Sequence, residues 1–343
     1  MAPRKQNKRR RKRRRRPTKA QRQRRWKLVS FALALLASAV LYVLDPIGSL
    51  DSPPPRDAEH LRVVSWNLEN FRGDPEDHDL ERLRQTIEAV DPDILAVQEI
   101  KDPEALAALL PGWGIALSKG GGRGHQKLGV AWRRDRVELV GQPVEHRELT
   151  LSGRVRPAFS AYFRDAARSS ASEASPPLDL WVTVVHLKAM PTGHEDRTTQ
   201  WPALVEAVRG LSKRDPDHVV LGDFNSTGAP GEGTATEHAE LDAALRPADL
   251  RRLPNSEGCS AYYDGARRDA WKEASEIDLV WVRGLEGALG ADPAVHSGTH
   301  CAAHHCRDFR STEAYPEPDY SFLSDHCPVI LDLRRGEPDG PAD

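Results

Sequence analysis

Short apolar segments recur along most of this chain, and they constrain its fold more than any other feature of the sequence. Each has about the length of one β-strand, and most are rich in valine, isoleucine, leucine or aromatic residues, as expected of buried strands. They are residues 61–66, 93–100, 128–134, 158–163, 180–187, 218–224, 277–282 and 327–333.

Helical patterns lie between some of these segments. Leu80, Leu83, Ile87 and Val90 recur at the three- and four-residue spacing of one helix face. Strands with interspersed helices predict an α/β fold, in which stacked sheets are covered by outer helices. Further helices are expected near residues 201–211 and 239–245, and insertions or long loops at 165–178, 226–238 and 284–322.

The N-terminal region has a different composition. Residues 1–27 hold 16 Lys and Arg and no acid, whereas the other 316 residues carry 33 basic and 51 acidic side chains, a net charge of −18. Residues 28–44 are uncharged and apolar, and as a helix they would span roughly 26 Å, close to what a bilayer needs. The positive-inside rule then predicts a cytoplasmic N-terminus and places the rest of the chain in the periplasm or outside the cell.

Other interpretations of these segments stay open. Residues 28–44 could be a cleaved signal peptide, because Ala37-Ser38-Ala39 fits a small-residue cleavage site, or a buried core helix. The basic tail could bind nucleic acid or direct nuclear import, or it could be a disordered topology signal on anionic lipid. The favoured division is a disordered cytoplasmic tail (1–27), a transmembrane anchor (28–44), a Pro-rich linker (45–60), one domain (61–335) and a disordered C-terminal tail (336–343).

Polar side chains recur at the ends of the predicted strands. Carboxylates suit a hard ion such as Mg²⁺, while amides and histidines can hold phosphate oxygens and a carboxylate can activate water. The pattern therefore favours a divalent-metal phosphoesterase. The absence of a G-x-S-x-G elbow, a P-loop lysine and an H-E-x-x-H helix argues against acyl transfer, NTP-driven chemistry and zinc proteolysis. The residues concerned are Asn67, Glu69, Glu99, His186, Asp223, Asn225, Asp278, Asp325 and His326.

Taken singly, each of these residues could be a helix cap or a turn residue. Their local words, in the order WNLENF, VQEI, HLK, LGDFNS, EIDLVWV and SDHCPV, resemble the endonuclease/exonuclease/phosphatase superfamily. That superfamily includes pancreatic-type deoxyribonucleases, apurinic endonucleases, inositol-phosphate phosphatases and bacterial sphingomyelinases. The resemblance covers residues 61–335. It implies a four-layer α/β/β/α sandwich of two mostly antiparallel sheets, an active site in a cleft at one sheet edge, and dependence on Mg²⁺ or Mn²⁺.

The resemblance also implies roles for individual residues around the metal and the phosphate. Glu99 would be the main Mg²⁺ ligand, with Glu69 and Asp325 assisting. Asn67 would hold a phosphate oxygen or a metal-bound water. Arg156 is the candidate for a further phosphate contact, although it could equally be a surface arginine.

The remaining implied roles concern water attack and charge stabilisation. Asp223 would orient or deprotonate the attacking water, and Asn225 would bind a phosphoryl oxygen and position Asp223. His186 would contact the scissile phosphate. His326 would stabilise the developing negative charge, and Asp278 would set its tautomer.

The four cysteines allow several arrangements. A disulfide between Cys301 and Cys306 is the favoured expectation outside the cytoplasm, and a zinc site with the neighbouring histidines is the alternative. Cys327 is expected to be a buried thiol, and Cys259 has no assigned partner.

The substrate is less constrained than the chemistry. WNLENF and HLKA look like the motifs of secreted and surface bacterial nucleases, so nucleic acid is the favoured partner, and Trp113, Arg123, Lys127, Arg154 and Arg156 could line a groove for it. The acidic body argues against tight duplex binding. The alternatives are a phosphatase or phosphodiesterase for lipid head groups or small phosphoesters, and a catalytically inactive surface module. The membrane is expected to be contacted through residues 28–44, and no protein partner is predicted.

Overall fold

The structure is a computed structural model that describes residues 56–166, 177–265 and 269–335. The predicted tail, anchor and C-terminal tail (1–27, 28–44 and 336–343) lie outside the described residues. Within these described ranges, none of the helices has both the length and the apolar character needed to cross a bilayer.

The first sheet has six strands in the order β14-β16-β1-β2-β4-β3. Its strands β1 and β2 run parallel, and the other neighbours are antiparallel. The strands are β1 (His60–Asn67), β2 (Ile94–Ile100), β3 (Gly114–Leu117), β4 (Lys127–Trp132), β14 (His296–Ser297) and β16 (Val329–Arg334).

The second sheet has seven strands in the order β10-β13-β9-β8-β7-β5, with β6 also paired to β7. Here β8 and β9 are the parallel pair. The strands are β5 (Val137–Leu139), β6 (Val144–His146), β7 (Ala158–Asp165), β8 (Asp179–His186), β9 (His218–Asp223), β10 (Arg251–Arg252) and β13 (Asp278–Arg283).

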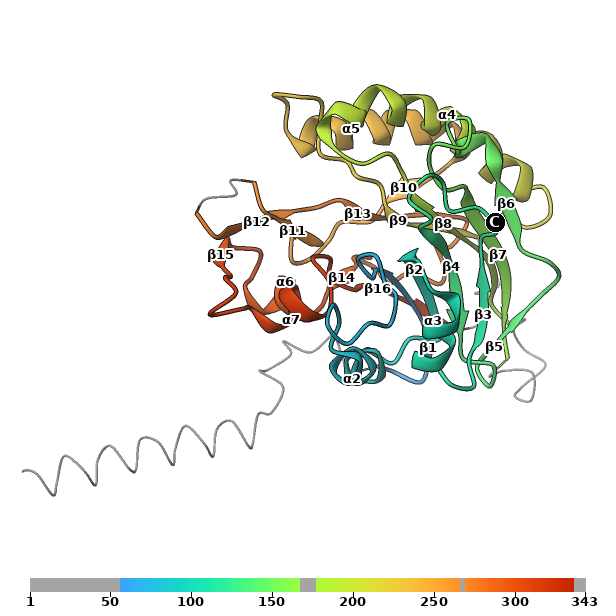
Figure 1. Cartoon of the computed structure of the whole chain (residues 1–343). Coiled ribbons are helices and arrows are strands. Elements are labelled where there is room, and N and C mark those ends of the chain that lie inside the picture. The colour runs from blue at the N-terminus through green and yellow to red at the C-terminus, as the bar shows by residue number, and fades with distance from the viewer. Residues whose placement is uncertain (1–55, 167–176, 266–268, 336–343) are drawn as a thin grey trace, which may run out of the picture. The chain divides into compact units, whose positions relative to one another are not determined.

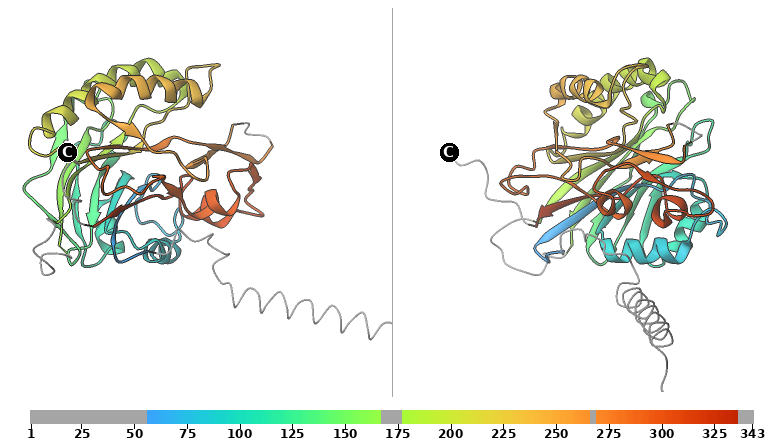
Figure 2. Two further views of the ribbon diagram at one scale, coloured as in Figure 1. Left: turned by 180° about the vertical axis from the view of Figure 1, so that it is seen from behind. Right: turned by 90° about the vertical axis from the view of Figure 1, so that its left-hand side faces the viewer.

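Helices cover the outer face of each sheet, so the described residues form layers of helix, sheet, sheet and helix (Figures 1 and 2). Apolar side chains of α2 and α3 pack with the outer face of the first sheet, and those of α4 and α5 pack with the outer face of the second. The helices are α2 (Leu80–Val90), α3 (Pro103–Leu109), α4 (His194–Leu211) and α5 (Thr234–Leu245), and one-turn 3₁₀ helices lie at Arg147–Leu149, Pro191–Gly193 and Arg246–Ala248.

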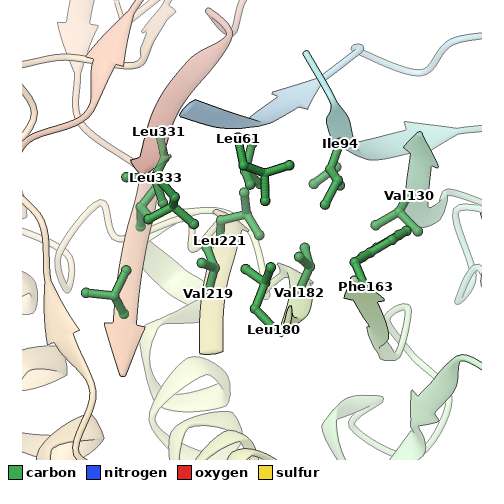
Figure 3. Packing of buried hydrophobic residues seen from close by; sticks show 14 of the residues in the cluster. Leu61, Ile94, Val130, Phe163, Leu180, Val182, Val219, Leu221, Leu331 and Leu333 are labelled. Carbon is green, nitrogen blue, oxygen red and sulfur yellow. The ribbon is translucent and has the colours of Figure 1, made fainter. Parts of the chain in front are cut away.

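Alternate side chains of the central strands fill the space between the two sheets (Figure 3). Val63 points into this interface while its neighbour Val64 packs on the helix side, and both are at most 1% exposed. Burial on both faces is why these strands read as continuous apolar runs. The expected α/β fold of two stacked sheets flanked by helices is confirmed, and each sheet is mixed.

A smaller sheet of three strands is present, and its last strand and two short helices lie in the region where the sequence suggested a long loop at residues 284–322. The sheet has the order β11-β12-β15. Two- and five-residue elements are too short to show a periodic pattern, so the expectation of a loop was wrong there. The elements are β11 (Ala261–Tyr263), β12 (Trp271–Ser275), α6 (Thr299–Ala303), β15 (Phe309–Arg310) and α7 (Pro318–Phe322).

The two parallel pairs have the same construction, strand–helix–strand, through α2 and α4 respectively. In a parallel pair both strands end at the same edge of the sheet. Asn67 therefore pairs in register with Gln98, next to Glu99, and His186 pairs with Asp223. Polar residues far apart in the sequence are brought to one end of the sandwich in this way.

A chain of buried polar side chains crosses the second sheet on its helix side. His146 Nε2 lies 2.8 Å from Ser160 Oγ, which lies 2.6 Å from Thr183 Oγ1, which in turn lies 2.9 Å from His218 Nε2. Burial lowers the pKa of His218 to about 3, with a smaller contribution from Arg283. His218 is therefore neutral in the folded protein.

We expect His218 to make the fold acid-sensitive. The unfolded chain takes up a proton near pH 6.5 and the folded chain does not, so this residue lowers the free energy of unfolding as the pH falls from 7 towards 3. Between pH 7 and pH 5 the loss is about 2 kcal/mol. Urea unfolding of His218→Gln at both pH values should show that the difference in the free energy of unfolding between pH 7 and pH 5 is smaller than in the wild type by that amount. An unchanged difference would mean that His218 is protonated in the folded state.

Candidate active site

Side chains from both sheets meet at the end of the sandwich where the parallel pairs terminate. The Nδ2 atom of Asn67, in the first sheet, lies 3.1 Å from Asp223 Oδ2 in the second and 3.4 Å from Glu99 Oε1. His186 Nε2 lies 3.2 Å from the same Asp223 oxygen and 3.7 Å from Glu99. One buried carboxylate, Asp223, thus faces an amide and an imidazole.

His326 completes this cluster from the segment before β16. Its Nδ1 lies 2.8 Å from Asp278 Oδ2, and its Nε2 lies 3.9 Å from Asp223 and 3.4 Å from Asn67 Nδ2. Asp278 is the register partner of Asp223 across β13 and β9. Because the Asp278 carboxylate accepts the Nδ1 proton, Nε2 of His326 is left facing the cleft.

The backbone is locally unusual where it presents these residues. Glu99 has a φ of 61° at a register shift between β2 and β4, and Asn225 has a φ of 51°. Non-glycine residues seldom adopt this left-handed region, and such departures concentrate at functional sites. At Asn225 the turn lets its backbone N–H donate to Asp223 Oδ1 at 2.8 Å, which orients the Asp223 carboxylate.

The electrostatics of the cleft are dominated by acids, of which Asp223 is buried, Asp325 is half-buried and Glu69 is exposed. Burial raises the pKa of Asp223 to about 7, and loss of hydration raises that of Glu69 to about 7 with a contribution from Asp325. Burial likewise raises the pKa of Asp325, and His326 nearby lowers it by less than burial raises it. The charges of Glu99 and Asp278 raise it further. The cleft therefore favours binding of a cation.

The two histidines of the cleft have opposite charge states. Burial, with Arg156 and His326 nearby, lowers the pKa of His186 well below its usual value, so His186 is neutral. Burial opposes the charge on His326, but Asp278 and Asp325 outweigh it and raise its pKa well above the usual value. His326 is thus a protonated donor.

Arg156 is buried beside this cluster. It is 8% exposed, and its Nε finds no hydrogen-bond partner among the described residues. Burial lowers its pKa to about 10, although the charges of Glu99 and Asp223 act in the opposite direction. A buried guanidinium with a spare donor next to the acids suits an anionic ligand better than a surface role.

Oxygen donors on one side of the cleft fit a divalent metal ion. The charges of Glu99, Glu69 and Asp325 act on one another there, and the Asp325 backbone N–H donates to Glu69 Oε2 at 3.2 Å. Carboxylates are the preferred ligands of Mg²⁺. Ligand atoms of Asp223, Asp278 and His326 also lie within 4.8 Å of one another. In that second group His326 Nδ1 is already bonded to Asp278, so the first group fits an oxygen-seeking ion better.

The other predicted contact residues separate into rim and structural positions. Arg123 is exposed on a Gly-rich loop at residues 120–126, which is tied to the cleft by Gln126 Nε2 donating to Asn70 Oδ1. Lys127 Nζ donates to the carbonyls of Ser118 and Lys119, and Arg154 pairs with Asp196.

Trp113, one of the residues expected to line a substrate groove, lies elsewhere, and two polar residues of α4 are held by other parts of the domain. Trp113 directly precedes Gly114, the residue of β3 that pairs with Trp132. That end of the sheet is opposite to the end at Glu99, so the prediction that Trp113 lines a substrate groove was wrong. His194 lies 2.8 Å from Glu240. Arg197 is fully buried and bonds to Glu237 and to the carbonyl oxygens of Lys188 and Met190, which makes it structural.

The disulfides differ from the expected pair. Cys259 is bonded to Cys306, and Cys301 to Cys327. The expectation of a Cys301–Cys306 bridge and a free Cys327 thiol was wrong, and Cys259 has a partner that the sequence did not identify. Helix α6 turns Cys301 towards the segment before β16, which sequence spacing alone does not show. Because all four sulfurs are used in disulfides, the cysteines supply no thiolate for zinc.

The disulfides hold a compact region that we name the cross-linked lobe, comprising β11, β12, α6, β15 and α7 with the described residues of 259–275 and 299–323. Ser260 follows Cys259, and its Oγ donates to Asp278 Oδ2 at 2.9 Å. Cys327 follows His326, and its N–H donates to the Ser260 carbonyl at 2.8 Å. The lobe therefore contacts both members of the His326–Asp278 pair.

Sequence reasoning missed the residues that position the catalytic candidates. Ser324 Oγ donates to the Asn67 carbonyl at 2.7 Å and accepts from the His326 N–H at 3.0 Å. The indole N–H of Trp66 donates to the His326 carbonyl at 3.0 Å. Trp66 and Ser324 are the first residues of the WNLENF and SDHCPV motifs, and these motifs were the available signal for them. No motif pointed to Ser260.

Comparison with known proteins agrees with this geometry. The model of the endonuclease/exonuclease/phosphatase family matches residues 64–326. The chain belongs to this family. Members of the family are phosphoesterases that use divalent metals, and this chain carries the corresponding acids. A comparison with curated protein sequences gives no significant match.

Solved structures of the endonuclease/exonuclease/phosphatase family share the fold at low sequence identity. The human Nocturnin catalytic domain is 17% identical with a TM-score of 0.52, covering 81% of this chain and 95% of its own. TDP2 of D. rerio, complexed with a single-strand DNA product, is 15% identical with a TM-score of 0.54, covering 81% and 99%. The Bacteroides thetaiotaomicron mannosyl-6-phosphatase Bt3783 is 17% identical with a TM-score of 0.53, covering 80% and 99%.

We expect Asp278→Asn to impair catalysis and to shift its pH dependence. Without the Asp278 charge, burial lowers the pKa of His326, so the donor loses its proton at a lower pH and the rate declines earlier as the pH rises. Loss of a positioned proton donor costs about 10²- to 10⁴-fold in kcat. The pH profile of kcat on a small phosphodiester at saturating Mg²⁺ checks this, and a lower rate with an unshifted profile would contradict it.

We expect the Cys301–Cys327 bridge to support both stability and activity. Replacing both cysteines by serine should lower the free energy of unfolding by about 2–5 kcal/mol and reduce turnover at temperatures where the variant is still folded, because Cys327 directly follows His326. Urea unfolding and steady-state rates give the two readouts. A folded variant with the wild-type rate would show that His326 is held without the bridge.

Proposed function

We propose that this protein is a divalent-metal-dependent nuclease that cleaves phosphodiester bonds of nucleic acids by attack of water. The charge balance of the cleft is the observation that carries the choice of a diester. Two cationic side chains, Arg156 and protonated His326, face a cluster of acids. A diester brings one negative charge, whereas a phosphomonoester approaches two near neutral pH. A diester is therefore the anion that this cleft accommodates more readily.

The side chains support water attack without a covalent intermediate on the protein. Asp223, with a pKa raised to about 7, is suited to accept a proton from water near neutral pH. Its carboxylate is oriented by the Asn225 N–H. His326 Nε2–H faces the same space and can donate to the phosphoryl or leaving oxygen as negative charge develops.

The remaining groups bind and orient the phosphate. Asn67 Nδ2 lies between Glu99 and Asp223 and can turn to a phosphoryl oxygen, and neutral His186 and Arg156 supply further donors. A bound Mg²⁺, held by Glu99 with Glu69 and Asp325, would polarise the phosphoryl oxygen and lower the pKa of water.

Two features next to the cleft support a substrate that extends beyond the phosphate. The Gly-rich loop with exposed Arg123 adjoins it through Asn70, and a groove that starts at Glu69 adjoins it in the cross-linked lobe. Among proteins of this fold, the relatives include one complexed with a DNA product and one named for a sugar phosphate. The fold alone does not choose between such substrates, so the proposal depends on the cleft.

We also propose that the domain works in an oxidising compartment and is tethered to a membrane by residues 28–44. Two disulfides beside the catalytic candidates support the compartment. The uncharged apolar sequence of residues 28–44, preceded by a basic segment, supports the tether and its orientation.

The proposal is tested with the full-length chain purified in mild detergent and supplied with Mg²⁺. DNA and RNA strands, a small phosphodiester, a phosphomonoester and phospholipid vesicles are compared as substrates. We expect cleavage of nucleic acid that is lost with EDTA, restored by Mg²⁺ or Mn²⁺, and reduced by at least about 10²-fold in Glu99→Gln and His326→Ala. Arg154→Gln serves as a matched control, because Arg154 pairs with Asp196 outside the cleft.

Two results would contradict the proposal. Hydrolysis confined to phosphomonoesters or lipids, with the same dependence on His326, would retain the chemistry and replace the substrate. If the folded, metal-loaded protein hydrolyses none of these substrates, the result would support a catalytically inactive module instead.

A further inference from the structure

A groove of about 790 Å³ runs from the catalytic cleft into the cross-linked lobe. Glu69 belongs to both, since it lines the groove and its carboxylate accepts from the Asp325 N–H. Tyr320 also adjoins both, because it lines the groove and the charges of Asp325 and Glu69 act on its hydroxyl, whose pKa is raised chiefly by burial. Whatever binds in this groove therefore lies next to the scissile phosphate.

The groove offers aromatic rings for stacking. Phe322 lines it and is 41% exposed, and Tyr320 lines it next to Lys272. The Lys272 ammonium lies 5.4 Å from the Tyr320 ring centre and 2.8 Å from Asp264, so it is held over the ring. Hydroxyl groups of Ser311 and Ser321, among other residues, complete the lining.

Exposed apolar side chains are concentrated in this lobe. Of the large hydrophobic side chains exposed among the described residues, only Met190 lies elsewhere. On the surface of a soluble protein, exposed aromatic side chains are seldom concentrated in one region that has no binding role. Those in the lobe are Tyr263, Trp271, Tyr315 and Phe322.

The charge of the groove limits how a nucleic acid could be held there. Glu69, Asp264 and Glu313 line it, and the one lysine among its described lining residues is already paired with Asp264. The chain after residue 27 carries a net charge of −18. Duplex binding depends mainly on neutralising phosphates with Lys and Arg, and the lining that the structure describes offers no unpaired cation for this. Stacking of bases on aromatic rings does not need such cations, but it needs bases that are not already stacked in a duplex.

We infer that this groove binds unpaired nucleotides next to the scissile phosphate, so that the enzyme acts on single-stranded nucleic acid. The inference rests on the proposed nuclease function. Phe322 and Tyr320 would stack with bases, and the fixed Lys272 ammonium would lie near the phosphate–sugar chain. Because few phosphates are neutralised in the groove, binding should depend only weakly on salt, with a slope of log KM against log salt of about 2 or less.

The test compares Phe322→Ala with Tyr315→Ala in the full-length protein. Tyr315 is 83% exposed in the same lobe but does not line the groove, so it controls for loss of an exposed ring. With a single-stranded oligonucleotide, Phe322→Ala should lower kcat/KM roughly 5- to 150-fold, the effect of one lost stacking contact. With a small phosphodiester, kcat/KM should stay within about twofold of wild type, because no base reaches the groove. Phe322→Tyr should restore oligonucleotide cleavage.

The outcomes separate this inference from the nuclease proposal. Equal cleavage of duplex and single strand by the wild type, a steep salt dependence, or full oligonucleotide activity in Phe322→Ala would overturn the inference and leave the nuclease proposal standing. An equal loss on the small phosphodiester would make Phe322 structural and also overturn it. Phe322-dependent hydrolysis confined to phospholipid vesicles would assign the groove to a lipid and overturn both.

Discussion

The apolar interface between the two sheets is the constraint on which the rest of the structure depends. It brings the β1–β2 and β8–β9 pairs face to face, so that both end at the same side of the sandwich. At roughly 25 cal/mol per Å² of buried apolar surface, this contact is among the main favourable terms in folding. Asn67 and Asp223 are 156 positions apart and lie 3.1 Å from each other for this reason. The cleft is a consequence of sheet packing, not of local sequence.

Gathering acids at that edge is unfavourable in itself. Glu69, Asp325 and Asp223 belong to one cleft, and their raised pKa values express loss of hydration and mutual repulsion among the acids of the cleft. Buried charges of one sign persist when ligands or opposite charges offset them. Here His326 and Arg156 do so in part, and a divalent cation would do the rest. The acids of the cleft lower the stability of the fold, and the same acids make the cleft a site for metal and phosphate.

The cross-linked lobe shows how a peripheral region can contribute to the same chemistry. Its small sheet and short helices have little apolar core of their own beyond Tyr262, Phe309 and the cysteines. Disulfides are a common substitute where a small region cannot bury enough surface. Both bridges adjoin residues that contact the His326–Asp278 pair, so the covalent framework of the lobe also holds the proton donor and limits one side of the cleft.

Much of the fold and of the candidate site could be predicted from the sequence. Buried strands such as 218–223 can be predicted from their apolar runs. The motif residues Glu99 and His326 lie near the ends of such strands. These signals are local, because a strand buried on both faces must be apolar along its whole length. The chemistry of a metal-dependent phosphoesterase follows from the residue types at those strand ends. Only the tertiary structure decided the cysteine pairing, the inward position of Arg156, the distance of Trp113 from the cleft and the support of Asp278 by Ser260. Each of these depends on which distant segments pack together, and that is set by the summed burial of the sheets and the lobe, which no local pattern of residues records.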